Sequence, residues 1–240
     1  MKIKSILTLV FAVLSVFFFL VLIFFRTPFT LYPLMSNQDT LDLLTPLVLI
    51  PIYWLMFRQT SRESSGLSEE TIFMLLAVFW VSGQGMHLAA NSVSNLIESL
   101  ARGQVLDIKP TDIYSLTYFL DEHLSHFIWH IGIIGLAVLL IYRDWRRPAD
   151  SPTRWWSTIL AGLLYGFMLF CIFLEGQTVM LGFPSCILIS LVVLIWGRKQ
   201  LAHKPILAFF FIAFLVAALF LAGWRLYWGG FPQFSDVGLI

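Results

Sequence analysis

The sequence predicts an all-α integral membrane protein, a polytopic bundle of about seven transmembrane helices. The chain of 240 residues is 59% hydrophobic and only 12% charged, and its mean hydropathy is +0.85. A soluble domain carries about a quarter charged residues, so a chain this poor in charge needs lipid as its solvent. Its apolar residues gather into runs close to the roughly 20 residues that one bilayer crossing requires. We therefore expect residues 1–240 to form a single integral membrane domain.

Seven apolar segments predict the helices. The first, from Ile6 to Phe25, is long and bulky and no small-x-small cleavage site follows it, so we expect an uncleaved helix rather than a signal peptide. Pro46, Pro51 and Pro184 leave the ends of the short second and sixth segments undefined. The expected helices cover residues 5–25, 43–57, 71–97, 114–142, 155–175, 182–197 and 205–226.

Lysine and arginine in the loops predict the orientation, because cytoplasmic loops carry an excess of both. With the N-terminus in the cytoplasm, the C-terminal tail from residue 228 to residue 240 lies outside. The inner segments then hold Lys2, Lys4, Arg58, Arg62, Arg143, Arg146, Arg147, Arg154, Arg198, Lys199 and Lys204. The outer segments hold only Arg26, Arg102, Lys109 and Arg225.

Net charge, cysteines and glycosylation motifs indicate which partners and which membrane to expect. A net charge of +1 gives no reason to expect nucleic acid as a partner, so the expected partners are membrane lipids. Cys171 and Cys186 both lie in apolar runs and are expected to be small buried residues rather than a disulfide. Asn91 is followed by Ser92 and Val93, so it forms no N-x-S/T sequon, and the sequence contains none. That absence fits a bacterial inner membrane.

Polar residues inside the predicted third helix form one stripe. At 100° per residue they fall within about 80° of one another, so the stripe must face protein or a cavity. Gly83 and Gly85 flank its start and allow another backbone or a ligand to approach closely. The stripe consists of Gln84, His87, Asn91, Ser94 and Glu98.

The predicted fourth helix carries the densest polar cluster, the segment from Asp121 to His130. His123, His126 and His130 fall within about 60° of one face, and Glu122 lies on the same side. Asp121 points nearly opposite, so we expect it to meet another helix or to be solvated at the outer interface.

Helical rise places the polar groups of three helices at a similar depth. The predicted fifth helix ends in Glu175-Gly176-Gln177. At about 1.5 Å per residue, His87, the segment around His126 and Glu175 all reach the outer half of the membrane. Ionisable groups gathered inside a membrane indicate a functional site.

The favoured interpretation is a metal site. Imidazole with carboxylate is a ligand set of zinc or non-haem iron, and His126 and His130 at i, i+4 can hold one ion from a single helix. His87 is the expected third ligand, Glu122 the expected general base, and His123 and Glu175 are reserves for either role. With one open position, zinc lowers the pKa of bound water to about 7. The sequence thus predicts a hydrolase acting on a lipid-like substrate from the outer leaflet.

Three other functions remain open. Haem b, ligated by His87 with His126 or His130, would make an electron-transfer protein, although the acid-rich cluster is unlike an apolar haem slot. A metal or proton transporter would use the same residues as a relay, but the polar groups stop in the outer half of the membrane. The chain could also be a non-catalytic subunit of a membrane complex.

One early histidine and a later His-x-x-x-His pair resemble the superfamily of alkaline ceramidases and adiponectin receptors. The resemblance covers these few residues, and the pair lies here in the fourth helix rather than the last. It implies a zinc-dependent membrane amide hydrolase, with His87, His126 and His130 as ligands and Ser82 as the nearby serine.

Overall fold

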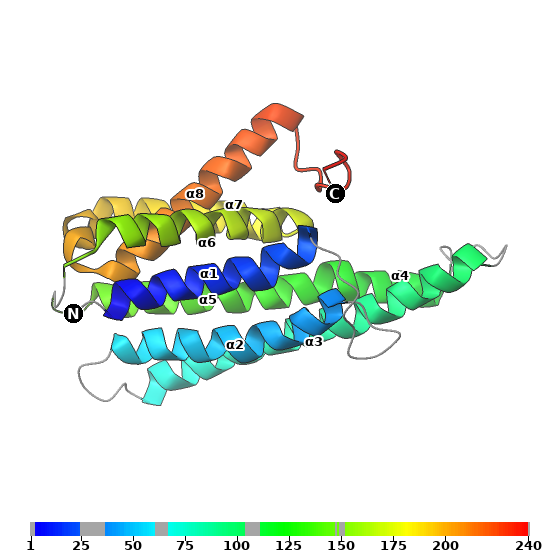
Figure 1. The fold of residues 1–240 in the computed structure, drawn as a ribbon, viewed down its shortest axis with the longest axis horizontal. Coiled ribbons are helices and arrows are strands. Elements are labelled where there is room, and N and C mark those ends of the chain that lie inside the picture. Colours follow the sequence, from blue (N-terminus) through cyan, green and yellow to red (C-terminus); the bar gives the residue numbers. More distant parts are fainter. Residues whose placement is uncertain are drawn as a thin grey trace.

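The computed structural model describes residues 3–24, 37–60, 67–103, 111–146, 148 and 152–239. Within these ranges the chain is all-α, and seven helical runs are long and apolar enough to span a membrane. The expectation of a polytopic integral membrane protein is confirmed at this level. The helices lie side by side and run alternately back and forth (Figure 1).

The seven spans contain eight α-helices and three segments of other helical type, counted over the described residues. The first three are α1 (Ile3–Phe24), α2 (Asn37–Gln59) and α3 (Leu67–Gly103). The fourth is a continuous run of α4 (Asp112–Tyr118), the π-helix η1 (Phe119–Ser125) and α5 (His126–Trp145). The last three are α6 (Trp155–Glu175), then α7 (Val179–Val192) with the π-helix η2 (Val193–Gly197) and the 3₁₀ helix η3 (Arg198–His203), and finally α8 (Pro205–Trp228).

Several helices extend beyond the predicted apolar segments. The α2 helix begins at Asn37 and includes both of its prolines, and Pro184 lies inside α7. The apolar run ends where polar residues begin, but the helix continues because it satisfies its own backbone hydrogen bonds. The earlier start of α2 matters for the site, since it adds two aspartates to the helix.

Close contact between α3 and α5 depends on two glycines. A Cβ atom on Gly83 would lie 2.4 Å from Trp129 N, and one on Gly132 would lie 2.6 Å from Trp80 N. Each glycine therefore lets the backbone of the facing helix approach, as the sequence suggested for Gly83. The crossing holds the polar stripe of α3 against the start of α5.

Basic residues close the end of the bundle at which α1 begins, here called the basic end. Arg143, expected in a loop, is buried: it ion-pairs with Glu69 and its Cζ atom lies 3.8 Å from the ring centroid of Phe57. Lys204 lies between η3 and α8, as expected, but it is buried and donates to the carbonyl of Asp144. Both buried charges are compensated by buried partners.

The chain after α8 returns to the bundle. Helix α8 leans away from the other helices towards its C-terminal end and stops at Gly229, whose φ is 72° (Figure 1). Pro232 O accepts a hydrogen bond from Trp224 Nε1 at 3.0 Å, and Phe234 is buried. The tail thus packs near the end of α6, opposite the basic end.

Candidate functional site

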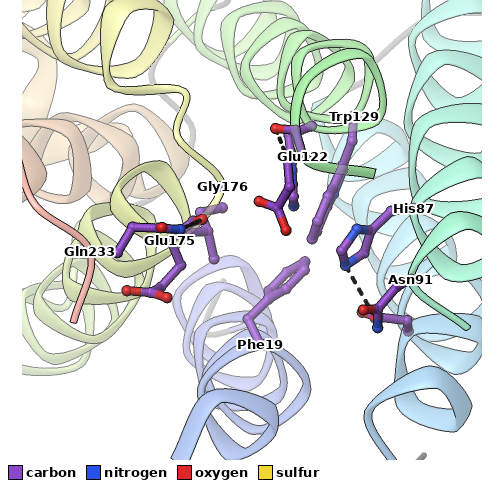
Figure 2. A pocket seen from close by; sticks show the side chains of 11 residues that line it. Phe19, His87, Asn91, Glu122, Trp129, Glu175, Gly176 and Gln233 are labelled. Atoms are coloured by element: carbon purple, nitrogen blue, oxygen red, sulfur yellow. Dashed lines mark hydrogen bonds and ion pairs between the residues drawn. The ribbon is translucent and has the colours of Figure 1, made fainter. Parts of the chain in front are cut away.

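A polar cavity of about 240 Å³ opens at the end of the bundle opposite the basic end. Side chains from α1, α2, α3, η1, α5, α6 and the C-terminal tail line it (Figure 2). Four of the predicted site residues are among them: His87, Glu122, His126 and Glu175. The structure therefore brings together residues that the sequence placed on three separate helices.

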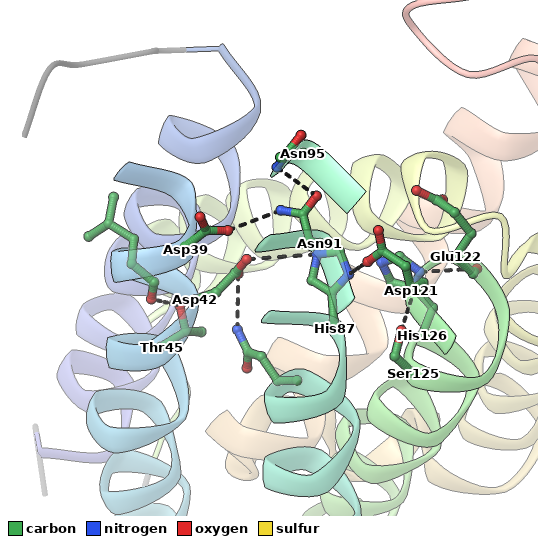
Figure 3. Close-up of polar contacts among 12 residues, drawn as sticks. Asp39, Asp42, Thr45, His87, Asn91, Asn95, Asp121, Glu122, Ser125 and His126 are labelled. Atoms are coloured by element: carbon green, nitrogen blue, oxygen red, sulfur yellow. Dashed lines mark hydrogen bonds and ion pairs between the residues drawn. The ribbon is translucent and has the colours of Figure 1, made fainter. Parts of the chain in front are cut away.

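His87 of α3 lies between two carboxylates. Its Nδ1 atom is 2.7 Å from Asp121 Oδ1, and its Nε2 atom is 3.7 Å from Asp42 Oδ2 (Figure 3). The side chain of His87 is only 16% exposed. A histidine held from both sides in this way is fixed in its ring orientation.

Asp121 was expected to meet another helix or to be solvated at the outer interface. The first alternative is confirmed, since Asp121 contacts His87 of α3, and the second is wrong, since Asp121 is 4% exposed. The cause is the π-helix η1, in which Asp121 lies. Hydrogen bonds from residue i to i+5 widen the turn, so each residue rotates the chain through a smaller angle than in an α-helix. Asp121 consequently shares the face of the site.

Helix α2 contributes two acids that the sequence analysis missed, Asp39 and Asp42. Asn91 Nδ2 donates to Asp39 Oδ1 at 3.1 Å, and Gln84 Nε2 donates to Asp42 Oδ1 at 3.3 Å (Figure 3). With His87, three residues of the predicted stripe on α3 thus meet α2. The side chain of Glu98, also assigned to the stripe, lies outside the described residues. The signal for both acids was their spacing of three residues directly before an apolar run.

His126 and His130 are both buried, and each holds its Nδ1 atom against an oxygen. His126 Nδ1 lies 3.1 Å from the carbonyl oxygen of Glu122, and His130 Nδ1 lies 2.5 Å from Thr178 Oγ1. The carbonyl can only accept, so Nδ1 of His126 carries the proton and its Nε2 keeps a free lone pair. The Nε2 atom of His130 is buried without a hydrogen-bond partner.

Gly176 fits these two rings because it lacks a side chain. A Cβ atom there would lie 2.9 Å from His130 Cε1 and 3.0 Å from His126 Cδ2. The sequence showed this glycine between two polar residues at the end of the fifth predicted helix, without indicating what it faces. It sets how closely α6 approaches the histidines.

The other acids of the cavity differ in their surroundings. Gln177 Nε2 donates to Glu122 Oε2 at 3.4 Å, so the Glu122 carboxylate is loosely held and faces the cavity. Glu175 Oε1 instead accepts from Phe234 N at 2.6 Å, and the Glu175 carbonyl accepts from Gln233 Nε2 at 2.7 Å. Glu175 therefore anchors the C-terminal tail while lining the cavity.

Three residues singled out from the sequence are not part of the cavity lining: His130, which is buried behind His126, and His123 and Ser82. The His123 ring packs against Tyr118 and Phe119, with its centroid 5.6 and 6.2 Å from theirs. Ser82, which corresponds to the serine of the resembled superfamily, is exposed on α3. Phe19 and Trp129 supply the aromatic wall that sequence reasoning did not assign.

The cavity is strongly acidic. Asp42, Glu122 and Glu175 line it, and no lysine or arginine is among its described lining residues. Carboxylates gathered away from bulk water need compensating protons or a bound cation.

The histidines are close enough to act together, although they do not already form a metal cage. Ring centroids of His87 and His126 are 4.5 Å apart, and those of His126 and His130 are 5.9 Å apart. Among the described residues, no group of three His, Cys, Asp or Glu side chains is arranged to hold one metal ion. Ligation would require ring nitrogens to turn towards a common point.

Comparison with protein families, curated proteins and solved structures finds no match for the chain.

Proposed function

We propose that this cavity is the site of a metal-dependent membrane hydrolase acting on a lipid-like substrate. The observation that supports it best is shared by three buried or nearly buried imidazoles. His87, His126 and His130 each place Nδ1 against an oxygen, on Asp121, Glu122 and Thr178 respectively. Metal-binding histidines commonly anchor one ring nitrogen in this way, because the anchor fixes the ring. The other nitrogen is open at His126 and His130, whereas at His87 it lies 3.7 Å from Asp42 and would exchange that carboxylate for the ion.

The residues of the cavity fit a cation in charge as well as in ligand type. His126 offers a neutral nitrogen at the cavity wall, and Asp42, Glu122 and Glu175 supply excess negative charge. We assign zinc as the ion, with non-haem iron as the alternative, and His87, His126 and His130 as its ligands. When bound, zinc would supply a Lewis acid able to activate water towards an ester, amide or phosphoester.

Glu122 is the proposed general base. Its carboxylate faces the cavity near His126, and its hydrogen bond from Gln177 Nε2 is 3.4 Å long. Such a carboxylate is free to accept a proton from an attacking water. Glu175 is better suited to positioning, since its carboxylate is already committed to the backbone of Phe234.

The activity is tested by incubating the purified protein with mixed phospholipids, ceramides and lipid esters and identifying products by mass spectrometry. We expect turnover that a chelator abolishes and zinc restores. Glu122→Gln should reduce it by about 10²–10⁴-fold, the usual contribution of a general base. The matched control is His203→Ala, an exposed histidine at the basic end, which should leave turnover unchanged. Turnover that persists in the chelator or in Glu122→Gln would contradict the proposal.

A relay of protons is the second candidate function, and one observation favours it. Inward from His87 and Asp42, Gln84 Oε1 accepts from Trp80 Nε1 at 2.7 Å. Deeper in the bundle, the hydroxyl oxygens of Tyr53 and Tyr165 lie 2.8 Å apart. Polar groups therefore continue further inward than the sequence suggested. Haem ligation by His87 with His126 is disfavoured, because rings 4.5 Å apart leave no space for a porphyrin between them.

We further propose that the N-terminus is cytoplasmic and that the cavity opens to the outer face of a bacterial inner membrane. The support is the bias of lysine and arginine towards the basic end. A protease-cleavable tag after residue 240 should be accessible only from outside intact cells. Cleavage only after the cytoplasm is exposed would reverse the orientation.

A further inference from the structure

A second, apolar groove lies between α2 and α3 and meets the polar cavity. Its volume is about 360 Å³, and its walls are mainly aliphatic side chains and prolines, among them Leu43, Pro46, Leu47 and Leu88. Two polar residues, Asp42 and Gln84, complete the lining. The groove is therefore apolar except where Asp42 and Gln84 lie.

Asp42 connects the groove to the candidate site. It lines both the groove and the cavity, and its carboxylate contacts His87 Nε2 and the Gln84 amide. Trp80 Nε1 holds the other end of that amide. Pro46 has no N–H to donate to the Asp42 carbonyl, so the same junction also offers a backbone acceptor.

Gly85 leaves the groove open. A Cβ atom on Gly85 would have no protein atom within 4 Å, whereas one on Gly83 would collide with the backbone of α5. The two glycines thus serve different purposes: Gly83 admits a helix, and Gly85 leaves space beside Asp42. That space is on the exposed side of α3, where lipid surrounds a membrane helix.

We propose that the groove between α2 and α3 holds a hydrocarbon chain of the substrate and admits it laterally from the bilayer. The head group would then lie in the cavity beside Asp42 and His87. The role of the head group in the cavity rests on the proposed function. The binding of the hydrocarbon chain in the groove does not. The expected substrate is an amphiphile with a flexible alkyl or acyl chain, because the walls are aliphatic and lack a flat aromatic platform.

A larger apolar groove between α6 and α8 is the alternative, and the structure argues against it. Its volume is about 800 Å³ and aromatic side chains dominate its lining. Phe234 closes it on the side of the cavity: the ring is 4% exposed and packs on Phe170 and Trp224. The two spaces share no lining residue among those described.

Photo-crosslinking tests the assignment without requiring turnover or metal. The full chain is reconstituted in vesicles of phosphatidylethanolamine and phosphatidylglycerol that contain a phosphatidylethanolamine with a diazirine in one acyl chain. Adducts are mapped by peptide mass spectrometry. We expect more adducts on residues 43–51 and 81–88 than on the lipid-facing side of α7, for example at Leu188.

Two glycine variants separate the grooves. Gly85→Leu fills the α2–α3 groove without meeting protein atoms, and should reduce adducts there by about tenfold, as an obstruction of methylene size or more does in an apolar pocket. Gly223→Leu is the matched control, since that glycine is equally open but lines the α6–α8 groove. It should leave the α2–α3 adducts unchanged. Leu47→Trp blocks the α2–α3 groove from the side of α2, and it replaces Gly85→Leu if that variant does not fold.

The proposal is overturned if Gly85→Leu and Leu47→Trp leave the adducts unchanged, if Gly223→Leu reduces them, or if labelling of the groove is no higher than that of α7. A protein that lacks metal but shows the expected adducts would overturn the hydrolase and keep the groove. A metal-containing protein without the adducts would overturn the groove and keep the hydrolase.

Discussion

The Nδ1 atom of His87 lies 2.7 Å from the carboxylate of Asp121, although His87 comes from α3 and Asp121 from the π-helix before α5. This contact fixes the ring of a proposed metal ligand and depends on the widened turn of η1. The acid and the imidazole are therefore expected to act as one unit.

Asp121→Asn should weaken zinc binding by about 10–100-fold, as the loss of a carboxylate behind a metal-binding histidine does. The measurement is a zinc titration of the metal-free protein. Asp112→Asn, an exposed acid at the start of α4, is the control and should bind as the wild type does. If Asp121→Asn retains full affinity while His126→Ala loses it, Asp121 has no part in orienting the ligand.

Gly176→Ala should disturb the two buried histidines. The φ of Gly176 is −79°, which alanine adopts freely, so the effect comes from the new methyl group. It would lie 2.8 Å from the Ile172 carbonyl oxygen, 2.9 Å from His130 and 3.0 Å from His126. We expect a loss of about 1–3 kcal/mol in the free energy of unfolding, the usual cost of overpacking. Thermal unfolding in detergent measures it. Gly223→Ala, where the methyl group meets open space, should have an unchanged melting temperature, and equal losses in both variants would argue against the packing described.

Variants of the hydroxyl pair of Tyr53 and Tyr165 test whether the pair is a structural contact or part of a proton relay. Tyr53→Phe leaves the buried hydroxyl of Tyr165 without its partner and should cost about 1–3 kcal/mol of unfolding free energy. The double variant Tyr53→Phe/Tyr165→Phe removes both polar groups and should recover most of that loss. Proton flux in liposomes is the second measurement. If wild-type protein conducts protons and the double variant does not, the pair belongs to a relay and the second candidate function is favoured.

The sequence predicted the seven candidate membrane spans and their helical type because lipid imposes long apolar runs, which composition reveals directly. The precise helix ends were harder to predict from the sequence. Asp39 and Asp42 precede the apolar run of α2, so a hydropathy criterion excluded them, yet the helix continues through both. The missed residues are therefore acids at the ends of helices.

The candidate site was predictable where it depended on spacing along one regular helix. His126 and His130 share a face of α5, as expected from their separation. The burial of Asp121 and the position of His123 outside the cavity lining were not predicted, because both residues lie in η1, whose turn differs from that of an α-helix. No single-sequence pattern indicated that turn. Nor did any pattern reveal that Gly176 faces the histidines, because the contact depends on how α6 packs against α5.

The central claim is tested most directly by the metal content and visible absorption spectrum of the detergent-purified protein, beside His126→Ala. We predict about one zinc per chain in the wild type, no visible band, and little or no zinc in the variant, which should still insert and elute as the wild type does. A wild type without metal, or a variant with full occupancy, would contradict the metal site. A Soret band would contradict it in favour of haem.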